Sequence, residues 1–375
     1  PILGIYLVAS AHLSLEQIAL MLGLSALISL VLQLPAGYFA DKFGNARAMK
    51  LGALIMLTHP LWYIFLPNFW GALIALELYT IGFTFLASGT IESLMHDTLV
   101  KLGREKEYTR RMGRAQSLGL IGNVIAVILV PLTFAVDHRL PFLVAFVTQI
   151  ALYFLVRSFD YPDVPRNHAP KRPVAALKSI VTWQNVALFV FFGFVTSLAW
   201  TSGAGEYMQL RLQDVGVAVG LLGMVQAGGS LVGAGFGQIL HIFDKVRPRL
   251  FYFLDLMFFV ICLAGLGLAP NWPFAAGVAM LFVGWIRVRK TVFQAKLLAE
   301  IGHVYKATLL SAMSLFTNIW QIFVPGVLAW SILSQGNSLA AGYILFAGLA
   351  FAIGTFLWSL IWLTVRRKTQ KTATG

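Results

Sequence analysis

Acidic and hydroxyl side chains recur at helical spacing within one apolar stretch of the chain, residues 69–95. At 100° per residue, Glu77, Thr80, Thr84, Ser88 and Glu92 fall within about 120° of one face of a helix. A stripe this polar cannot face lipid, so it lines a cavity or packs against another helix. Ionisable residues in membrane spans are candidates for function. The alternative is an internal hydrogen-bonded packing seam.

Neutral hydrogen-bonding groups form similar faces in two other apolar stretches. Residues 307–331 contain Asn318 and Gln321 on one face, and residues 114–136 contain Gln116 and Asn123. Such groups can hold a small substrate without requiring a fixed charge, whereas the alternative is hydrogen bonding between helices.

A further face in residues 183–210 combines Thr196, Trp200, Gly203 and Tyr207, with Glu206 at its margin near one end. Aromatic residues near the end of a span can belong to the interfacial belt, but Trp200 lies too deep for that, which favours a cavity. From these faces we expect substrate to contact Thr84, Ser88, Gln116, Asn123, Trp200, Tyr207, Asn318 and Gln321.

Two intramembrane carboxylates are candidates for proton coupling, Glu206 first and Glu77 second. A carboxyl with little water around it holds its proton toward neutral pH, which suits reversible loading. Structural neutral carboxyls are the alternative. By contrast, the small residues Gly229, Gly233 and Gly237 form a stripe that predicts close packing against another helix.

The composition requires these stretches to lie in a membrane. The chain has 375 residues, of which 58% are hydrophobic and 11% are charged, whereas soluble chains have about 25% charged residues. This excludes a soluble enzyme and a disordered scaffold, and the single Cys262 excludes an internal disulfide. Twelve apolar stretches predict an all-α membrane protein: 1–11, 17–38, 50–66, 69–95, 114–136, 140–157, 183–210, 217–241, 250–268, 272–292, 307–331 and 339–365.

The first stretch is too short to cross a bilayer at about 1.5 Å per residue, and the sequence starts at Pro1. We expect the cytoplasmic half of this first helix to be missing from the sequence given. A polar, proline-rich segment separates two sets of six stretches. The predicted organisation is therefore a bundle at 1–158, a linker at 159–182, a bundle at 183–365 and a tail at 366–375.

The net charge of +13 is explained by topology. If the connections alternate sides, all of the 28 Lys and Arg residues except Arg139 and Arg211 fall on one side. That side is expected to be cytoplasmic, together with the linker and the C-terminus. Nucleic acid is therefore not an expected partner, and the chain is expected to be a multi-pass protein of the inner cell membrane.

The two halves contain related patterns. Tyr108, Ala115 and Ser117 recur 197 residues later as Tyr305, Ala312 and Ser314. Two sets of six spans in the same orientation are parallel repeats, an arrangement that places a substrate site at mid-membrane between two rocking bundles.

The loop that follows the second stretch resembles a signature of the major facilitator superfamily, G-x-x-x-D-[R/K]-x-G-[R/K]-[R/K]. Gly37, Asp41, Lys42 and Gly44 match it, while the last two positions differ and leave Arg47 as the nearest basic residue. The resemblance implies two pseudo-symmetric six-helix bundles, close helix approach at Gly37, and a cytoplasmic lock involving Asp41 and Arg47. The fourth stretch lacks the arginine of the best-known drug antiporters, and Ser88 to Glu92 look instead like efflux-type members.

The repeat offset relates Glu92 to Arg289, close to Arg287. In the family's architecture these helix ends approach one another, so we expect Glu92 to pair with Arg287 or Arg289 in the outward-facing state. The alternative is that both arginines extend to lipid headgroups.

The resulting expectation is a secondary active transporter that works by alternating access, with proton-driven export of a small amphipathic molecule such as a drug, siderophore or metabolite. A proton-coupled importer or a facilitator is the alternative, and a membrane enzyme or a non-transporting sensor is a more distant one. The seven histidines show no metal-ligand spacing, and no nucleotide-binding or catalytic motif is present. We therefore expect no metal or cofactor, and a monomer.

Overall fold

The computed structural model describes residues 2–87, 90–104, 107–158, 183–203, 205–244, 246–301 and 306–373. Contacts divide the chain into two compact units, Ile2–Ala169 and Pro170–Gly375. The division falls within the expected linker, 159–182, which lies outside the described residues.

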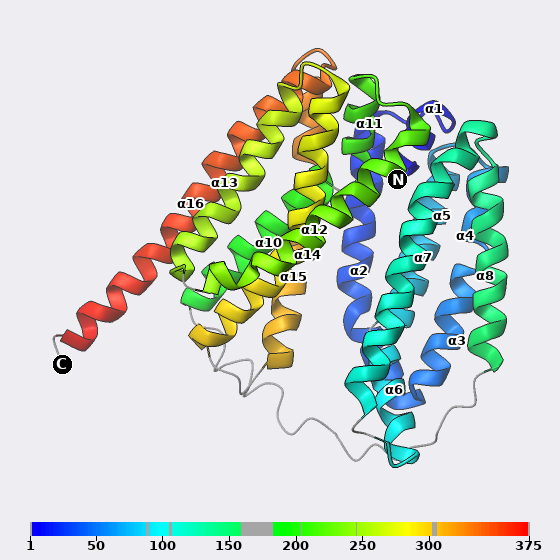
Figure 1. Cartoon of the computed structure of the whole chain (residues 1–375), viewed down its shortest axis with the longest axis horizontal. Coiled ribbons are helices and arrows are strands. Elements are labelled where there is room, and N and C mark those ends of the chain that lie inside the picture. The colour runs from blue at the N-terminus through cyan, green and yellow to red at the C-terminus, as the bar shows by residue number, and fades with distance from the viewer. Residues whose placement is uncertain are drawn as a thin grey trace. The chain divides into compact units, whose positions relative to one another are not determined.

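The first unit consists of helices connected mostly by short turns (Figure 1). At its centre, α5 packs closely against three other helices, α2, α3 and α4. The helices are α1 (Leu3–Ala9), α2 (Leu15–Phe43), α3 (Asn45–Met56), α4 (His59–Phe65), α5 (Phe69–Ala87), α6 (Thr90–Lys101), α7 (Tyr108–Val136) and α8 (Leu140–Ser158).

The second unit is also helical throughout its described part. Its closest helix pairs are α12 with α14, α10 with α15, and α13 with α16. The elements are α10 (Trp183–Gly203), α11 (Glu206–Asp214), the short 3₁₀ helix η2 (Val219–Leu221), α12 (Leu222–Asp244), α13 (Pro248–Gly267), α14 (Trp272–Ile301), α15 (Lys306–Leu333) and α16 (Leu339–Ala373).

Ten helical stretches of the described residues are long and apolar enough to cross a membrane. They confirm an all-α membrane protein and correspond to ten of the twelve expected spans. The other two correspond to α1, which has 7 residues, and to α14, which has 30 residues but carries Arg287, Arg289 and Lys290.

A boundary in the second unit differs from the sequence prediction. The expected span at 183–210 is interrupted, because α10 ends at Gly203 and α11 begins at Glu206. A Cβ atom on Gly205 would lie 2.8 Å from the carbonyl oxygen of Trp200, so the chain folds back against the last turn of α10. α16 continues as a helix to Ala373, into the expected tail.

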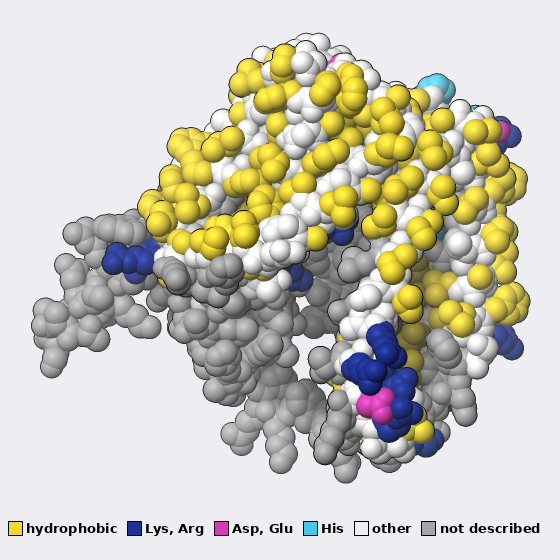
Figure 2. Space-filling view, in the orientation of Figure 1, with side chains coloured by type: hydrophobic (Ala, Val, Ile, Leu, Met, Phe, Trp, Pro, Cys, Tyr) yellow, Lys and Arg dark blue, Asp and Glu magenta, His cyan; other side chains and the backbone are white. Residues whose placement is uncertain are grey.

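Basic side chains gather at one end of the first unit. The junction of α2 and α3, the start of α7 and the end of α8 lie at the same end (Figure 1). Figure 2 shows Lys and Arg side chains around the first turns of α7, with hydrophobic side chains further along this helix. At the junction, Gly44 has φ of 90°, a conformation that glycine adopts without strain, and this explains the second glycine of the signature.

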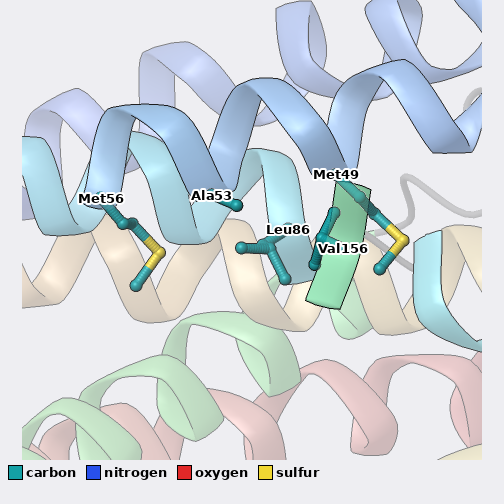
Figure 3. Close-up of a cluster of buried hydrophobic side chains, with 5 residues drawn as sticks. All are labelled: Met49, Ala53, Met56, Leu86 and Val156. Carbon is teal, nitrogen blue, oxygen red and sulfur yellow. The ribbon is translucent and has the colours of Figure 1, made fainter. Parts of the chain in front are cut away.

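A hydrophobic cluster fixes α3 against its neighbours. Met49, Ala53 and Met56 of α3 are buried with Leu86 of α5 and Val156 of α8. Figure 3 shows these side chains on the facing sides of the ribbons. Since burial of apolar surface is strongly favourable between packed helices only when the fit is close, α3, α5 and α8 have a defined register here.

Two glycines of the predicted α12 stripe, Gly229 and Gly233, pack closely against α14, whereas a Cβ atom on Gly237 would meet nothing within 4 Å. A Cβ atom on Gly229 would lie 2.7 Å from the Cβ of Val283. On the opposite helix, a Cβ atom on Gly284 would lie 2.9 Å from the backbone nitrogen of Gly233 and 3.0 Å from the carbonyl oxygen of Gly229. The two backbones approach too closely for a larger side chain.

Gly284→Ala should therefore destabilise the second unit, because the added methyl meets backbone atoms that cannot move independently. Overpacking of this kind costs about 1–3 kcal/mol. Gly277→Ala is the matched control, since Gly277 belongs to the same helix and a Cβ atom there would meet nothing within 4 Å. Thermal unfolding in detergent should show a lower melting temperature for the first variant alone; equal effects would refute close packing as the reason.

Candidate functional site

The second unit contains a buried ion pair between α13 and α14. The Arg289 guanidinium donates to both carboxylate oxygens of Asp255, with Nη2 2.6 Å from Oδ2 and Nε 3.0 Å from Oδ1. Both residues are at most 2% exposed. The Trp285 indole donates a further hydrogen bond of 2.7 Å to Asp255 Oδ1.

The same guanidinium connects this pair to α10. Its Nη1 donates to the Thr196 hydroxyl at 2.8 Å, and its Cζ atom lies 5.2 Å from the ring centre of Phe192 and 5.3 Å from that of Phe259. Two buried charges are costly unless paired and hydrogen-bonded. Here the carboxylate and the guanidinium satisfy each other, so the network holds α10, α13 and α14 together.

Asp255 is not among the site residues expected from the sequence, although a single acid in the apolar stretch 250–268 is itself a signal. Arg289 was expected at a gate with Glu92. In the structure Arg289 is engaged by Asp255 within its own unit, whereas Arg287 is exposed. Because the side chain of Glu92 lies outside the described part of the chain, its pairing stays a prediction, with Arg287 as the exposed candidate.

The first unit contains a buried carboxyl without a partner. Both carboxylate oxygens of Glu77 are inaccessible to solvent and have no hydrogen-bond partner among the described residues. An ionised carboxylate in this position would lack both water and a donor, which is very costly. The geometry therefore fits a neutral carboxyl group in the part of α5 that lies within the candidate span Phe69–Leu86.

The hydroxyl groups of the same stripe are partly used in packing. Thr80 Oγ1 lies 2.6 Å from Ser25 Oγ of α2, and the Thr84 hydroxyl donates to the Thr80 carbonyl at 2.7 Å. These contacts support the alternative of helix-to-helix hydrogen bonding for Thr80. They leave Glu77 as the chemically distinctive group of the stripe.

Glu206 lies outside the candidate span Asn185–Gly203, at the first residue of α11. It is partly buried, and burial raises its pKa above the ordinary value, while a hydrogen bond from its own backbone lowers it in part. The expected continuous face of 183–210 is wrong, because α10 ends at Gly203 and a separate helix begins at Glu206. On α10, Thr196 contacts Arg289, and Gly203 is in close contact with Phe282.

The segment that contains Glu206 is anchored to the ends of other helices. Arg211 donates hydrogen bonds to the carbonyl oxygens of Leu266 at 2.9 Å and Gly267 at 3.2 Å, at the end of α13, and it pairs with Asp214. The Tyr343 hydroxyl donates to the carbonyl of Ser202 at 3.1 Å, at the end of α10. Carbonyl groups at helix ends need such donors.

The residues expected to bind substrate occupy different environments. Trp200 is 51% exposed, Tyr207 is fully buried within the second unit, and Asn318 and Gln321 are half-buried on α15. Asn123 is exposed on α7. Thr84 is half-buried, while Ser88 and the Gln116 side chain lie outside what the structure describes.

The remaining residues of the expected gate are placed only in part. A Cβ atom on Gly37 would meet nothing within 4 Å. Arg47 is exposed on α3, and Asp41 belongs to α2 but its side chain is outside the described set. Within the described residues, no group of three or more His, Cys, Asp or Glu side chains could hold a metal ion.

Residues 1–325 match the sequence model of the protein family described as the Major Facilitator Superfamily. A relative in Bacillus subtilis (strain 168), described as the uncharacterized MFS-type transporter YxaM, is 23% identical over 254 residues. This alignment covers 65% of the chain and 62% of the relative, so the chain spans less than two thirds of that protein.

Two solved transporters share the fold. The nucleoside transporter NupG has a TM-score of 0.79 and 12% identity, covering 96% of this chain and 93% of its own. A D-xylose-proton symporter has a TM-score of 0.66 and 15% identity, covering 96% and 91%.

Breaking the buried ion pair should destabilise the second unit strongly. Asp255→Leu leaves the Arg289 charge buried without a partner, at an expected cost of about 3–5 kcal/mol. Asp255→Leu combined with Arg289→Met removes both charges and should recover most of the lost stability. Thermal unfolding in detergent measures both variants, and a double variant as unstable as the single one would contradict an ion pair as the source.

Glu206 should make stability depend on pH. Because its pKa is raised in the folded state, the folded protein holds this proton more tightly than the unfolded chain. The stabilisation is complete below the ordinary pKa and is lost as pH rises through the raised value. The melting temperature of the wild type should therefore fall relative to Glu206→Gln with rising pH, whereas parallel curves would show that Glu206 is equally solvated in both states.

Proposed function

This chain belongs to the major facilitator superfamily. We propose that it is a secondary transporter, which couples the movement of a small amphipathic organic molecule to a proton gradient by alternating access. The observation that carries the proposal is the buried, unpartnered carboxyl of Glu77. The expected location is the inner cell membrane, with the linker cytoplasmic and protons as the coupling ion.

Glu77 has the properties that a proton carrier requires. Its oxygens are inaccessible to solvent and have no hydrogen-bond donor in the described part of the chain, so the neutral form is favoured in this conformation. A conformational change that brings water to the carboxyl would favour loss of the proton. As the carboxyl becomes accessible to water from one side of the membrane and then from the other, it takes up a proton on one side and releases it on the other.

Glu206 is the second candidate for the proton site. Its pKa is raised by burial, but it lies at the start of α11, outside the candidate span. Asp255 is less suited, because its carboxylate is held by Arg289 and Trp285.

The substrate class follows from the side chains expected to bind it. Trp200 is a large exposed aromatic, and Asn123, Asn318 and Gln321 offer neutral hydrogen-bonding groups. This combination suits an uncharged or weakly charged molecule with an apolar body. Export is our first proposal and import by proton symport is the second, since the same proton chemistry serves both directions.

Glu77→Gln should abolish coupling while leaving the fold intact, because the amide retains the shape but cannot exchange a proton. Proteoliposomes containing a pH-sensitive dye would be tested with the uncharged molecules uridine and chloramphenicol, added on either side. Substrate-dependent proton movement should occur in the wild type, and in Glu77→Gln it should fall to the level of protein-free liposomes. Exchange of labelled for unlabelled substrate should persist in the variant.

Glu16→Gln is the matched control, since this carboxylate is exposed at the start of α2 in the same unit. It should preserve proton movement. Persistent coupled movement in Glu77→Gln, together with its loss in Glu206→Gln, would move the proton site to Glu206. Transport by the wild type that is indifferent to pH would exclude proton coupling altogether.

A further inference from the structure

A groove lies on the surface of the first unit between α3 and α8, at the end where the basic side chains gather. It has a volume of about 430 Å³. We propose that this groove binds the headgroup of an anionic phospholipid. Its lining residues are Lys50, Leu51, Leu54, Tyr153 and Arg157.

The groove is ordered from charged to apolar along the helix axes. Because α3 starts at Asn45, Lys50 lies one turn nearer the N-terminus of this helix than Leu54 does. Because α8 ends at Ser158, Arg157 lies one turn nearer its end than Tyr153. One turn is about 5.4 Å, so two cations form the rim above an apolar and phenolic floor, which is the order of phosphate, glycerol and acyl chain in a phospholipid.

The rim has the donors that a phosphate group requires. Lys50 and Arg157 are both exposed. Arg157 Nη1 donates to the Tyr153 hydroxyl oxygen at 3.4 Å, which leaves the hydroxyl proton able to donate to a ligand. A guanidinium and an ammonium together can neutralise a phosphate and hydrogen-bond it from two sides.

The floor of the groove is fixed by the hydrophobic cluster of α3, α5 and α8. Met49 and Val156 are buried in that cluster next in sequence to Lys50 and Arg157, and Figure 3 shows their side chains close together. Tyr153 packs against the same cluster. The two cations therefore extend from a rigid base, and this distinguishes the groove from isolated basic residues on a mobile loop.

The surroundings favour a lipid over a free anion. Leu54 is 51% exposed, and the neighbouring Phe154 and Leu155 of α8 are 62% and 52% exposed. Both helices belong to candidate membrane spans, so these side chains face acyl chains. Basic pockets between membrane helices attract anionic headgroups in the adjoining leaflet.

The test is a titration of purified protein with phosphatidylglycerol, followed by native mass spectrometry, with phosphatidylcholine as the reference lipid. The wild type should retain one phosphatidylglycerol in preference to phosphatidylcholine. Lys50→Gln combined with Arg157→Gln should weaken this binding by roughly tenfold. Arg247→Gln combined with Arg249→Gln removes the same charge elsewhere and should leave it unchanged.

A further variant separates a lipid from a free anion. Leu54→Ser should weaken phosphatidylglycerol binding while both cations remain, and glycerol 3-phosphate should compete poorly with the lipid. Equal loss in both double variants would show attraction to surface charge alone and overturn the site. Unchanged binding in the Lys50 and Arg157 variant, or equal competition by glycerol 3-phosphate, would overturn it as well.

Discussion

The constraint that shapes this protein is that lipid offers no hydrogen bonds, so each polar group inside a span must find its partner within the protein or remain neutral. The two units meet this constraint differently. In the second unit, Asp255 and Arg289 satisfy one another and are joined by Trp285 and Thr196. In the first unit, the Glu77 carboxyl is buried and has no hydrogen-bond partner among the described residues. The paired charges suit a rigid bundle, and the unpaired carboxyl suits a group that changes its protonation.

Much of the fold could be predicted because lipid imposes a pattern on the sequence. The apolar stretches locate ten candidate spans, and the stripe at Gly229 and Gly233 identifies the tightly packed face of α12. The signature loop can be recognised in the sequence because one of its positions requires glycine: Gly44 has a backbone conformation that most residues avoid. These features are local, and a local pattern is what a sequence displays directly.

The remainder depends on contacts that no local pattern reveals. Arg289 looked like a basic residue at a helix end, yet its partner Asp255 lies on another helix, 34 residues earlier. The break between Gly203 and Glu206 was missed because the residues around it continue the helical spacing of polar groups. For the same reason, Tyr207 was expected in a cavity but is buried in its own unit. Tertiary packing decides each of these cases.

The central claim is that the Glu77 carboxyl is protonated in the conformation described. Infrared spectroscopy of the purified protein in lipid measures this directly, because a protonated carboxyl has a carbonyl band that a carboxylate lacks. At neutral pH the wild type and Glu16→Gln should both show this band, and Glu77→Gln should lose its intensity. An identical band in the wild type and in Glu77→Gln would mean that Glu77 is ionised, and it would contradict the account.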